Sequence, residues 1–308
     1  MSSLRITTKH HIMLICWAAL LAGLTVPAAA ADDSPARRHL IMGLIYGVKG
    51  IPDREEAAYK KAISIKPDLA EAHFALGCLY AQNNLGKPAK EQFEAAIKYK
   101  PNFSLAYYNL SIICFSEKDS FDKGVEYMQR VFKFKPDYPE AHFELGVAFG
   151  GRGELQKAIE EYEEAVKYKP SFWRAYQNMG TTYLLMQQYQ KAASSFRKVL
   201  EIKRDAPAAL INLGNIYMQT GVIDQAIESY KAAIAAHPEL LKAHFNLGMC
   251  YRKSGDSFAA VEHFFMAGKI SLKNGDKEGA QKCLEVIKET DPNSRHYTEL
   301  QDMINSGV

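Results

Sequence analysis

The chain has 308 residues, of which 47% are hydrophobic and 24% charged, as in an ordinary folded protein. Its 38 basic and 35 acidic residues nearly cancel, so charge gives no reason to expect nucleic acid as a partner. The length suits either two globular domains or one array of repeats.

Residues 1–31 have the pattern of a secretory signal peptide. Arg5 and Lys9 precede the apolar run 12–26, and small residues follow it. A run of about 15 residues is short for a bilayer core of roughly 30 Å, so we expect cleavage, export to the periplasm and a short linker at 32–35. The alternative is an uncleaved segment that anchors the protein in the inner membrane, facing the periplasm.

A pattern of about 34 residues recurs along the rest of the chain. In each copy an apolar residue and a small one are followed three residues later by an aromatic, and a second set of small and aromatic residues comes after a turn. These spacings predict two amphipathic helices per copy. In one copy the two sets are Leu213, Gly214 and Tyr217, then Ala226, Tyr230 and Ala233. The copies close at Pro67, Pro101, Pro136, Pro170 and Pro238, with Arg204 in the remaining place.

This pattern resembles the tetratricopeptide repeat, a helix–turn–helix of 34 residues. The resemblance implies an all-α fold, a right-handed α-solenoid of stacked helix pairs, because such a repeat buries its apolar face only against its neighbours. We expect two capping helices in residues 275–308, and a longer turn within residues 115–121, where one residue is inserted. The seven predicted repeats are 36–69, 70–103, 104–138, 139–172, 173–206, 207–240 and 241–274.

No pattern of a catalytic or metal site occurs: HExxH, GxSxG, a phosphate-loop lysine motif, CxxC and zinc spacings are all missing from the sequence. The cysteines after residue 31 are therefore expected to be buried thiols, and Cys250 with Cys283 is the pair to test for a disulfide. Four histidines hold the same place in their repeats, which favours packing over metal binding. They are His39, His73, His142 and His244. We predict no enzymatic activity, no cofactor and no metal.

The resemblance also implies that the first helices line a concave groove that binds a partner. In some tetratricopeptide proteins a row of asparagines before the apolar–small pair binds the main chain of an extended peptide, because each amide offers a donor and an acceptor. Asparagine is also simply common at that place in the family, and this alternative stays open. The predicted row is Asn109, Asn178, Asn212 and Asn246; the apolar anchors are Phe74, Tyr108 and Phe143; the polar and basic contacts are Gln177, Thr181, Asn215, Lys242, Arg252 and Lys253.

The sequence thus favours an exported scaffold or adaptor that binds a peptide segment or helix of another protein, in the assembly of a cell-envelope complex. The alternative function is a membrane-anchored accessory subunit of an envelope enzyme or secretion complex. The pattern predicts a protein partner, no nucleic acid, membrane contact only if the N-terminal segment is uncleaved, and no particular oligomeric state.

Overall fold

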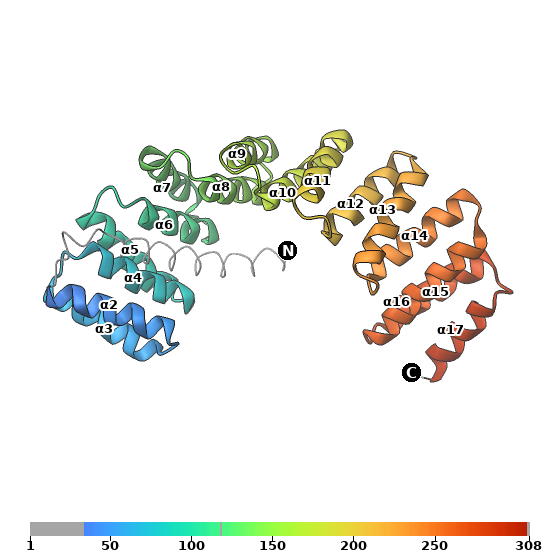
Figure 1. Ribbon diagram of the computed structural model, residues 1–308, viewed down its shortest axis with the longest axis horizontal. Helices are drawn as coiled ribbons and strands as arrows, with labels where there is room; N and C mark the ends of the chain where they lie inside the picture. Colours follow the sequence, from blue (N-terminus) through green and yellow to red (C-terminus); the bar gives the residue numbers. More distant parts are fainter. Residues whose placement is uncertain (1–33, 118, 307–308) are drawn as a thin grey trace. The chain divides into compact units, whose positions relative to one another are not determined.

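The computed structural model describes residues 34–117 and 119–306, and within these ranges it contains sixteen α-helices and no strand (Figure 1). The all-α class predicted from the sequence is confirmed. The chain divides into two compact halves, residues 1–148 and 149–308, and each has its own apolar clusters. The predicted signal peptide, residues 1–31, lies outside the described residues.

The N-terminal half consists of consecutive helix pairs. Its helices are α2 (Pro35–Val48), α3 (Pro52–Ile65), α4 (Ala70–Gln82), α5 (Gly86–Tyr99), α6 (Ser104–Ser116), α7 (Phe121–Phe134) and α8 (Pro139–Gly151), within which the division between the halves falls. The predicted longer turn is confirmed, because residues 117–120 separate α6 from α7 whereas 83–85 separate α4 from α5. Each second helix also packs on the next first helix, α3 on α4 and α5 on α6.

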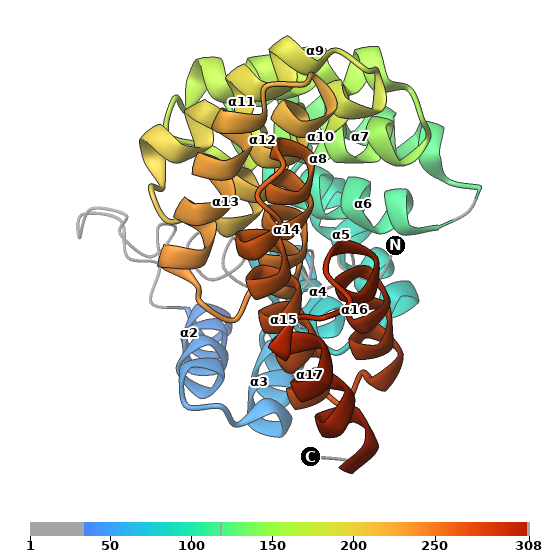
Figure 2. The same cartoon turned by 90° about the vertical axis from the view of Figure 1, so that its right-hand side faces the viewer.

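The C-terminal half continues the same arrangement. Its helices are α9 (Leu155–Tyr168), α10 (Trp173–Leu185), α11 (Tyr189–Ile202), α12 (Pro207–Gln219), α13 (Ile223–Ala236), α14 (Leu241–Ser254), α15 (Ser257–Lys273), α16 (Lys277–Thr290) and α17 (Arg295–Ser306). The last three pack together (Figure 2), and α17 buries Leu300 and Ile304 against α15 and α16. The outward residues of α17 are polar, so it ends the core of this half.

The two helices of a repeat meet where a glycine faces an aromatic ring. A Cβ atom added to Gly214 would lie 2.6 Å from the ring of Tyr230, and one added to Gly180 would lie 2.8 Å from the ring of Phe196. The missing side chain therefore lets the ring lie directly against the helix backbone. The third repeat has Ser111 in place of glycine, and there the partner is the flexible Met128 instead of a ring.

Three of the recurring histidines fasten a first helix to the turn before it. His73, His142 and His244 are buried, and Nε2 of each lies 2.9, 3.3 and 3.0 Å from the carbonyl oxygen of the proline six residues earlier. A carbonyl only accepts, so Nε2 carries the proton and donates. The predicted packing role is confirmed for these three, while the partly exposed His39 has a different environment.

Cys250 and Cys283, the pair named for testing, form no disulfide, as the expectation of buried thiols predicted. Both are buried free thiols, as is Cys114. Cys250 belongs to the apolar cluster between α13 and α14, whereas Cys283 belongs to the cluster of α15, α16 and α17. Burial raises the pKa of each of these two thiols to about 11, so both stay protonated and unreactive at neutral pH.

Among residues 34–117 and 119–306, no helix has the length and apolar character needed to cross a bilayer. The apolar run 12–26, on which the alternative of a membrane anchor depends, lies outside these ranges.

We predict that Gly214→Ala destabilises the C-terminal half. Tyr230 is only 1% exposed and cannot move aside, so overpacking should cost about 1–3 kcal/mol, of which the better helix propensity of alanine offsets at most about 1 kcal/mol. Urea unfolding followed by circular dichroism measures the change. The matched control is Gly86→Ala, because a Cβ there meets nothing within 4 Å. A midpoint as high for Gly214→Ala as for Gly86→Ala would contradict the packing role.

A second prediction concerns His263 of α15, whose Nδ1 lies 3.2 Å from Nδ1 of His244. Because His244 donates through Nε2, its Nδ1 accepts when the ring is neutral, so His263 must donate. Burial lowers the pKa of His263, His244 and Lys231 lower it further, and Glu262 opposes them.

The folded pKa of His263 therefore lies below the unfolded value of about 6.5, and its contribution to stability is complete above that pH. As pH falls below about 6.5, the unfolded chain takes up the proton first, so the free energy of unfolding decreases until the folded pKa is passed. Melting temperatures between pH 7.5 and 5 should fall more steeply for wild type than for His263→Gln. The control is His237→Gln, at an exposed histidine, and it should keep the wild-type slope. A His263→Gln profile parallel to that of wild type would contradict the role assigned to His263.

Candidate functional site

The predicted contact residues of the C-terminal half lie on the first helices α10, α12 and α14. Thr181, Asn215, Lys242 and Lys253 are exposed, whereas Gln177, Asn178, Asn212, Asn246 and Arg252 are partly exposed. We call these nine residues the first-helix face. A partner can reach all of them, and their binding role stays a prediction.

Two amides of this face are joined across neighbouring repeats. Nδ2 of Asn246 on α14 donates to Oδ1 of Asn215 on α12 at 2.9 Å, and the hydroxyl of Tyr230 on α13 donates to the same oxygen at 2.6 Å. Burial raises the pKa of Tyr230 above its ordinary value, so its hydroxyl stays a donor. Two donors on one oxygen fix the orientation of the Asn215 amide. Nδ2 of Asn215 and Oδ1 of Asn246 remain available, a donor beside an acceptor.

The other two asparagines of the face are not held in this way. Asn178 and Asn212 make no side-chain hydrogen bond within the described parts of the chain, and both are partly exposed. Thr181 takes the place on α10 that Asn215 takes on α12, but its hydroxyl donates to the carbonyl oxygen of Gln177 at 3.1 Å. The amides of Asn178 and Asn212 are therefore free to turn toward a ligand.

The basic side chains of α14 divide into two kinds. Arg252 pairs with Glu289 of α16, with 3.3 Å between Nη1 and Oε2, so part of its hydrogen-bonding capacity is used within the protein. Lys242 and Lys253 are exposed and make no ion pair among the described residues. These two lysines give the α14 end of the face a positive charge, which suits a carboxylate of a partner.

The contacts predicted in the N-terminal half are wrong for Phe74 and Tyr108. Phe74 is 1% exposed, and its ring centre lies 4.8 Å from that of Phe103, the residue just before α6. Tyr108 is also 1% exposed and packs at 5.4 Å on Tyr138, the residue just before α8. These rings join one repeat to the next and offer nothing to a partner. Aromatic residues just ahead of first helices are the sequence signal that could have revealed this pairing.

Phe143 and Asn109 are also inaccessible. Phe143 is 8% exposed, and Asn109 is 1% exposed with its Nδ2 donating to the carbonyl oxygen of Leu105 in its own helix. The predicted row therefore fails in this half, where a buried Ala75 and a nearly buried Glu144 take the neighbouring places. The accessible row is confined to the C-terminal half.

Sequence reasoning treated Tyr230 only as a core residue and missed its effect on the site. The equivalent residues of neighbouring repeats are Phe196 and Phe264, so the added hydroxyl was a readable signal. The Tyr230 hydroxyl reaches the first-helix face because the ring packs against Gly214, and Asn215 is the next residue of α12.

Comparisons with known families agree with this architecture. A profile described as TPR repeat matches residues 57–84, 152–187 and 214–255, and two profiles described as tetratricopeptide repeat match residues 183–229 and 264–294. The chain belongs to the tetratricopeptide repeat family. Tetratricopeptide repeat proteins act as scaffolds for protein–protein interaction, so the partner class is protein, and none of these families is catalytic. A comparison with curated proteins finds no match.

Several solved structures are similar to part of the chain. A crystal structure of MamA is 31% identical over 53% of this chain and 95% of its own, with a TM-score of 0.50. A second crystal structure of MamA protein is 29% identical over 55% of this chain and 92% of its own, with a TM-score of 0.51. A double mutant of MamA from RS-1 is 22% identical over 56% of this chain and 96% of its own, with a TM-score of 0.51, which concerns the fold alone.

Proposed function

We propose that this protein is a non-enzymatic adaptor whose first-helix face in the C-terminal half binds an extended segment of a partner protein. The observation that carries the proposal is the fixed amide pair of Asn215 and Asn246, which presents a donor beside an acceptor. An extended main chain offers the complementary acceptor and donor at each peptide group. Asn178 and Asn212 extend the row of amides along neighbouring first helices.

The charges of the first-helix face favour a partner segment that carries a carboxylate. Lys242 and Lys253 are exposed on α14, and no acidic residue belongs to the first-helix face. Pairing between these ammonium groups and a carboxylate gives orientation and speeds association more than it adds affinity. We therefore propose that the segment places an acidic side chain or its terminal carboxylate at α14 and its main chain across α12 and α10.

We predict that replacing Asn178, Asn212 and Asn246 together by alanine abolishes capture of the partner. Each amide lost removes main-chain hydrogen bonds worth about 0.5–1.5 kcal/mol, so three such losses should weaken binding by about one to three orders of magnitude. The measurement is affinity capture from an envelope extract with quantitative mass spectrometry. A control variant replaces the exposed Gln190 and Gln225 on the second helices by alanine and should capture what wild type captures.

Tyr230→Phe sharpens this test, because it leaves every asparagine in place and removes only the hydroxyl that orients Asn215. It should weaken capture without abolishing it. Equal capture of the same proteins by wild type and the triple variant, with unchanged circular dichroism, would refute the assignment of the face.

We also propose that the protein works in the periplasm after removal of residues 1–31, in the assembly of a cell-envelope complex. What supports this is the order of basic, apolar and small residues in that segment. The intact mass of protein purified from its natural host should correspond to a chain that begins near Asp32. A mass that includes residues 12–26 would favour the alternative, an anchored accessory subunit at the inner membrane.

A further inference from the structure

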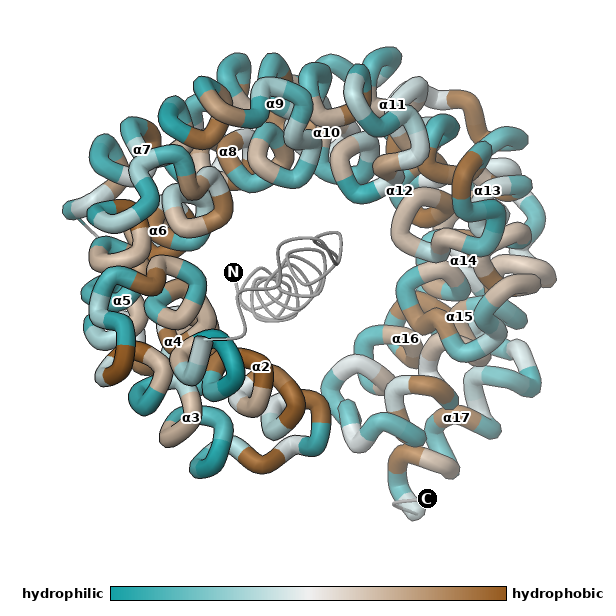
Figure 3. Tube along the Cα trace, turned by 60° about the vertical axis from the view of Figure 1, so that its left-hand side comes forward, coloured by the Kyte–Doolittle hydropathy of each residue, from teal (hydrophilic) through white to brown (hydrophobic). Residues whose placement is uncertain are grey.

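The outward side of α2 carries large apolar side chains. Met42, Ile45 and Val48 recur every third residue and are 41%, 40% and 69% exposed. Figure 3 shows the corresponding hydrophobic stretches on α2. A helix with apolar residues on several sides is normally covered on several sides. Within the described parts of the chain, α2 buries Leu40 and Leu44 toward α3 and α4 only, which leaves this outward side uncovered.

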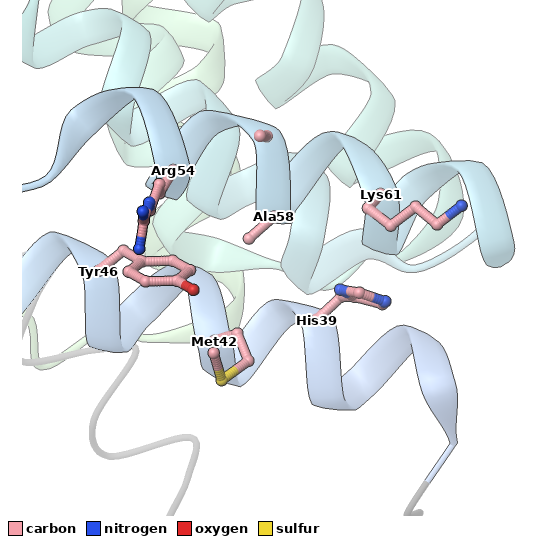
Figure 4. Close-up of a pocket in the computed structure, with 7 residues that line it drawn as sticks. His39, Met42, Tyr46, Arg54, Ala58 and Lys61 are labelled. Atoms are coloured by element: carbon pink, nitrogen blue, oxygen red, sulfur yellow. The ribbon is translucent and has the colours of Figure 1, made fainter.

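A pocket of about 350 Å³ opens between α2 and α3 beside this apolar stripe (Figure 4). Met42 and Tyr46 of α2 and two alanines of α3 form its apolar part. Its basic residues are His39, Arg54 and Lys61, and no carboxylate lines it. The Arg54 guanidinium lies 5.9 Å from the centre of the Tyr46 ring. The pocket therefore joins an apolar surface to a basic rim.

The second repeat shows which element covers the surface of α4 that is equivalent to the outward side of α2. Leu76 and Leu79 of α4 hold the places that Met42 and Ile45 hold in α2, and they are only 3% and 4% exposed. They are buried in one cluster with residues of α3, the second helix of the preceding repeat. In the first repeat no described helix precedes α2 to provide this cover. The element that would cover α2 is therefore a helix, placed against α2 as α3 is placed against α4.

The recurring tyrosine indicates the charge of that missing helix. Tyr80 holds in α4 the place of Tyr46, and its hydroxyl donates to Oε1 of Glu56 on the preceding α3 at 2.9 Å. Within the described residues, Tyr46 has no such acceptor from an earlier helix. An incoming glutamate would supply it.

The repeat of α10 and α11 matches the first repeat still more closely. Lys191 of α11 lies 5.4 Å from the ring centre of Tyr183, at the same sequence spacing as Arg54 from Tyr46. There the preceding helix α9 brings Glu163, which accepts from the Tyr183 hydroxyl at 3.4 Å. A cation over the ring and a carboxylate at the hydroxyl therefore occur together in this chain.

We propose that the outward face of α2 and α3 binds an amphipathic helix of a partner protein, with its apolar stripe on Met42, Ile45 and Val48 and a glutamate or aspartate at Tyr46. The basic rim of the pocket complements such a helix. This site belongs to the N-terminal half and does not depend on the first-helix face.

A second copy of the chain fits this face less well. Two copies of the same face would bring Arg54 and Lys61 close to their own equivalents. The terminal helix α17 exposes acidic residues, Glu299 and Asp302, but no large apolar side chain to cover Met42 and Val48.

The experiment uses the full chain and a helix that the chain itself provides. The probe is a fluorescent peptide of residues 155–168, the α9 sequence, stapled between positions 156 and 160 because an isolated 14-residue helix is only marginally stable. Its binding is measured by fluorescence anisotropy. It should bind about tenfold more tightly than a stapled peptide of residues 189–202, the α11 sequence, which brings Arg197 instead of a glutamate to the following tyrosine.

Two variants test the contacts. Ile45→Glu should weaken binding of the α9 peptide about tenfold or more, because it removes apolar contact and repels the acidic helix. The matched control is Val222→Glu, at a residue of similar exposure in the other half, and it should leave binding unchanged. Tyr46→Phe should weaken binding of the α9 peptide but not of its Glu163→Ala form, which offers the hydroxyl no acceptor; this separates the hydroxyl–carboxylate contact from general loss of structure.

Three kinds of outcome would overturn the proposal. One is the failure of either binding comparison, that is, equal binding of the α9 and α11 peptides or unchanged binding by Ile45→Glu. Another is a wild-type dimer that Ile45→Glu converts to a monomer, which would make a second copy the occupant. The third is binding of the peptide only after deletion of residues 1–33, which would assign the face to the chain's own N-terminal segment.

Discussion

The contact between a glycine of the first helix and an aromatic ring of the second is the interaction on which every other feature depends. It sets the distance between the two helices, and Gly180 and Gly214 show how little room remains beside Phe196 and Tyr230. A tyrosine ring in this place also carries a hydroxyl past the glycine to the next residue of the first helix. Tyr230 does so when its hydroxyl fixes the Asn215 amide. One side chain thus links the packing of the repeat to the orientation of an amide on the first-helix face.

The two ends of the described chain differ in the side chains that they expose to solvent. At the C-terminal end, α17 turns Leu300 and Ile304 inward and presents polar residues to solvent, as a capping helix should. At the other end, α2 presents Met42, Ile45 and Val48. A repeat array needs polar surfaces at its ends to remain soluble, so an apolar end is a surface that another helix is expected to cover.

The accessible polar groups of the first helices differ between the two halves. In the N-terminal half three of the residues ahead of the apolar–small pair, Ala75, Asn109 and Glu144, are buried, and Phe74 packs on Phe103. In the C-terminal half the same positions carry asparagines that solvent reaches. The family provides the scaffold, and this difference in side chains is the reason why we propose a peptide-binding face in the second half only.

The sequence alone determined the repeat, the helix pairs and the packing role of His73, because these follow from periodic spacing, which a linear chain displays directly. The longer turn before α7 was equally readable, since one inserted residue shifts the period. Tertiary structure decided which predicted contacts are accessible. Phe74 and Tyr108 have the spacing of exposed anchors, yet the rings that end their own repeats, just before the next first helix, pack on them. Such cover depends on residues about 30 positions away. The orientation of Asn215 and the uncovered face of α2 likewise depend on which helices are neighbours in space, and spacing along the chain does not encode that.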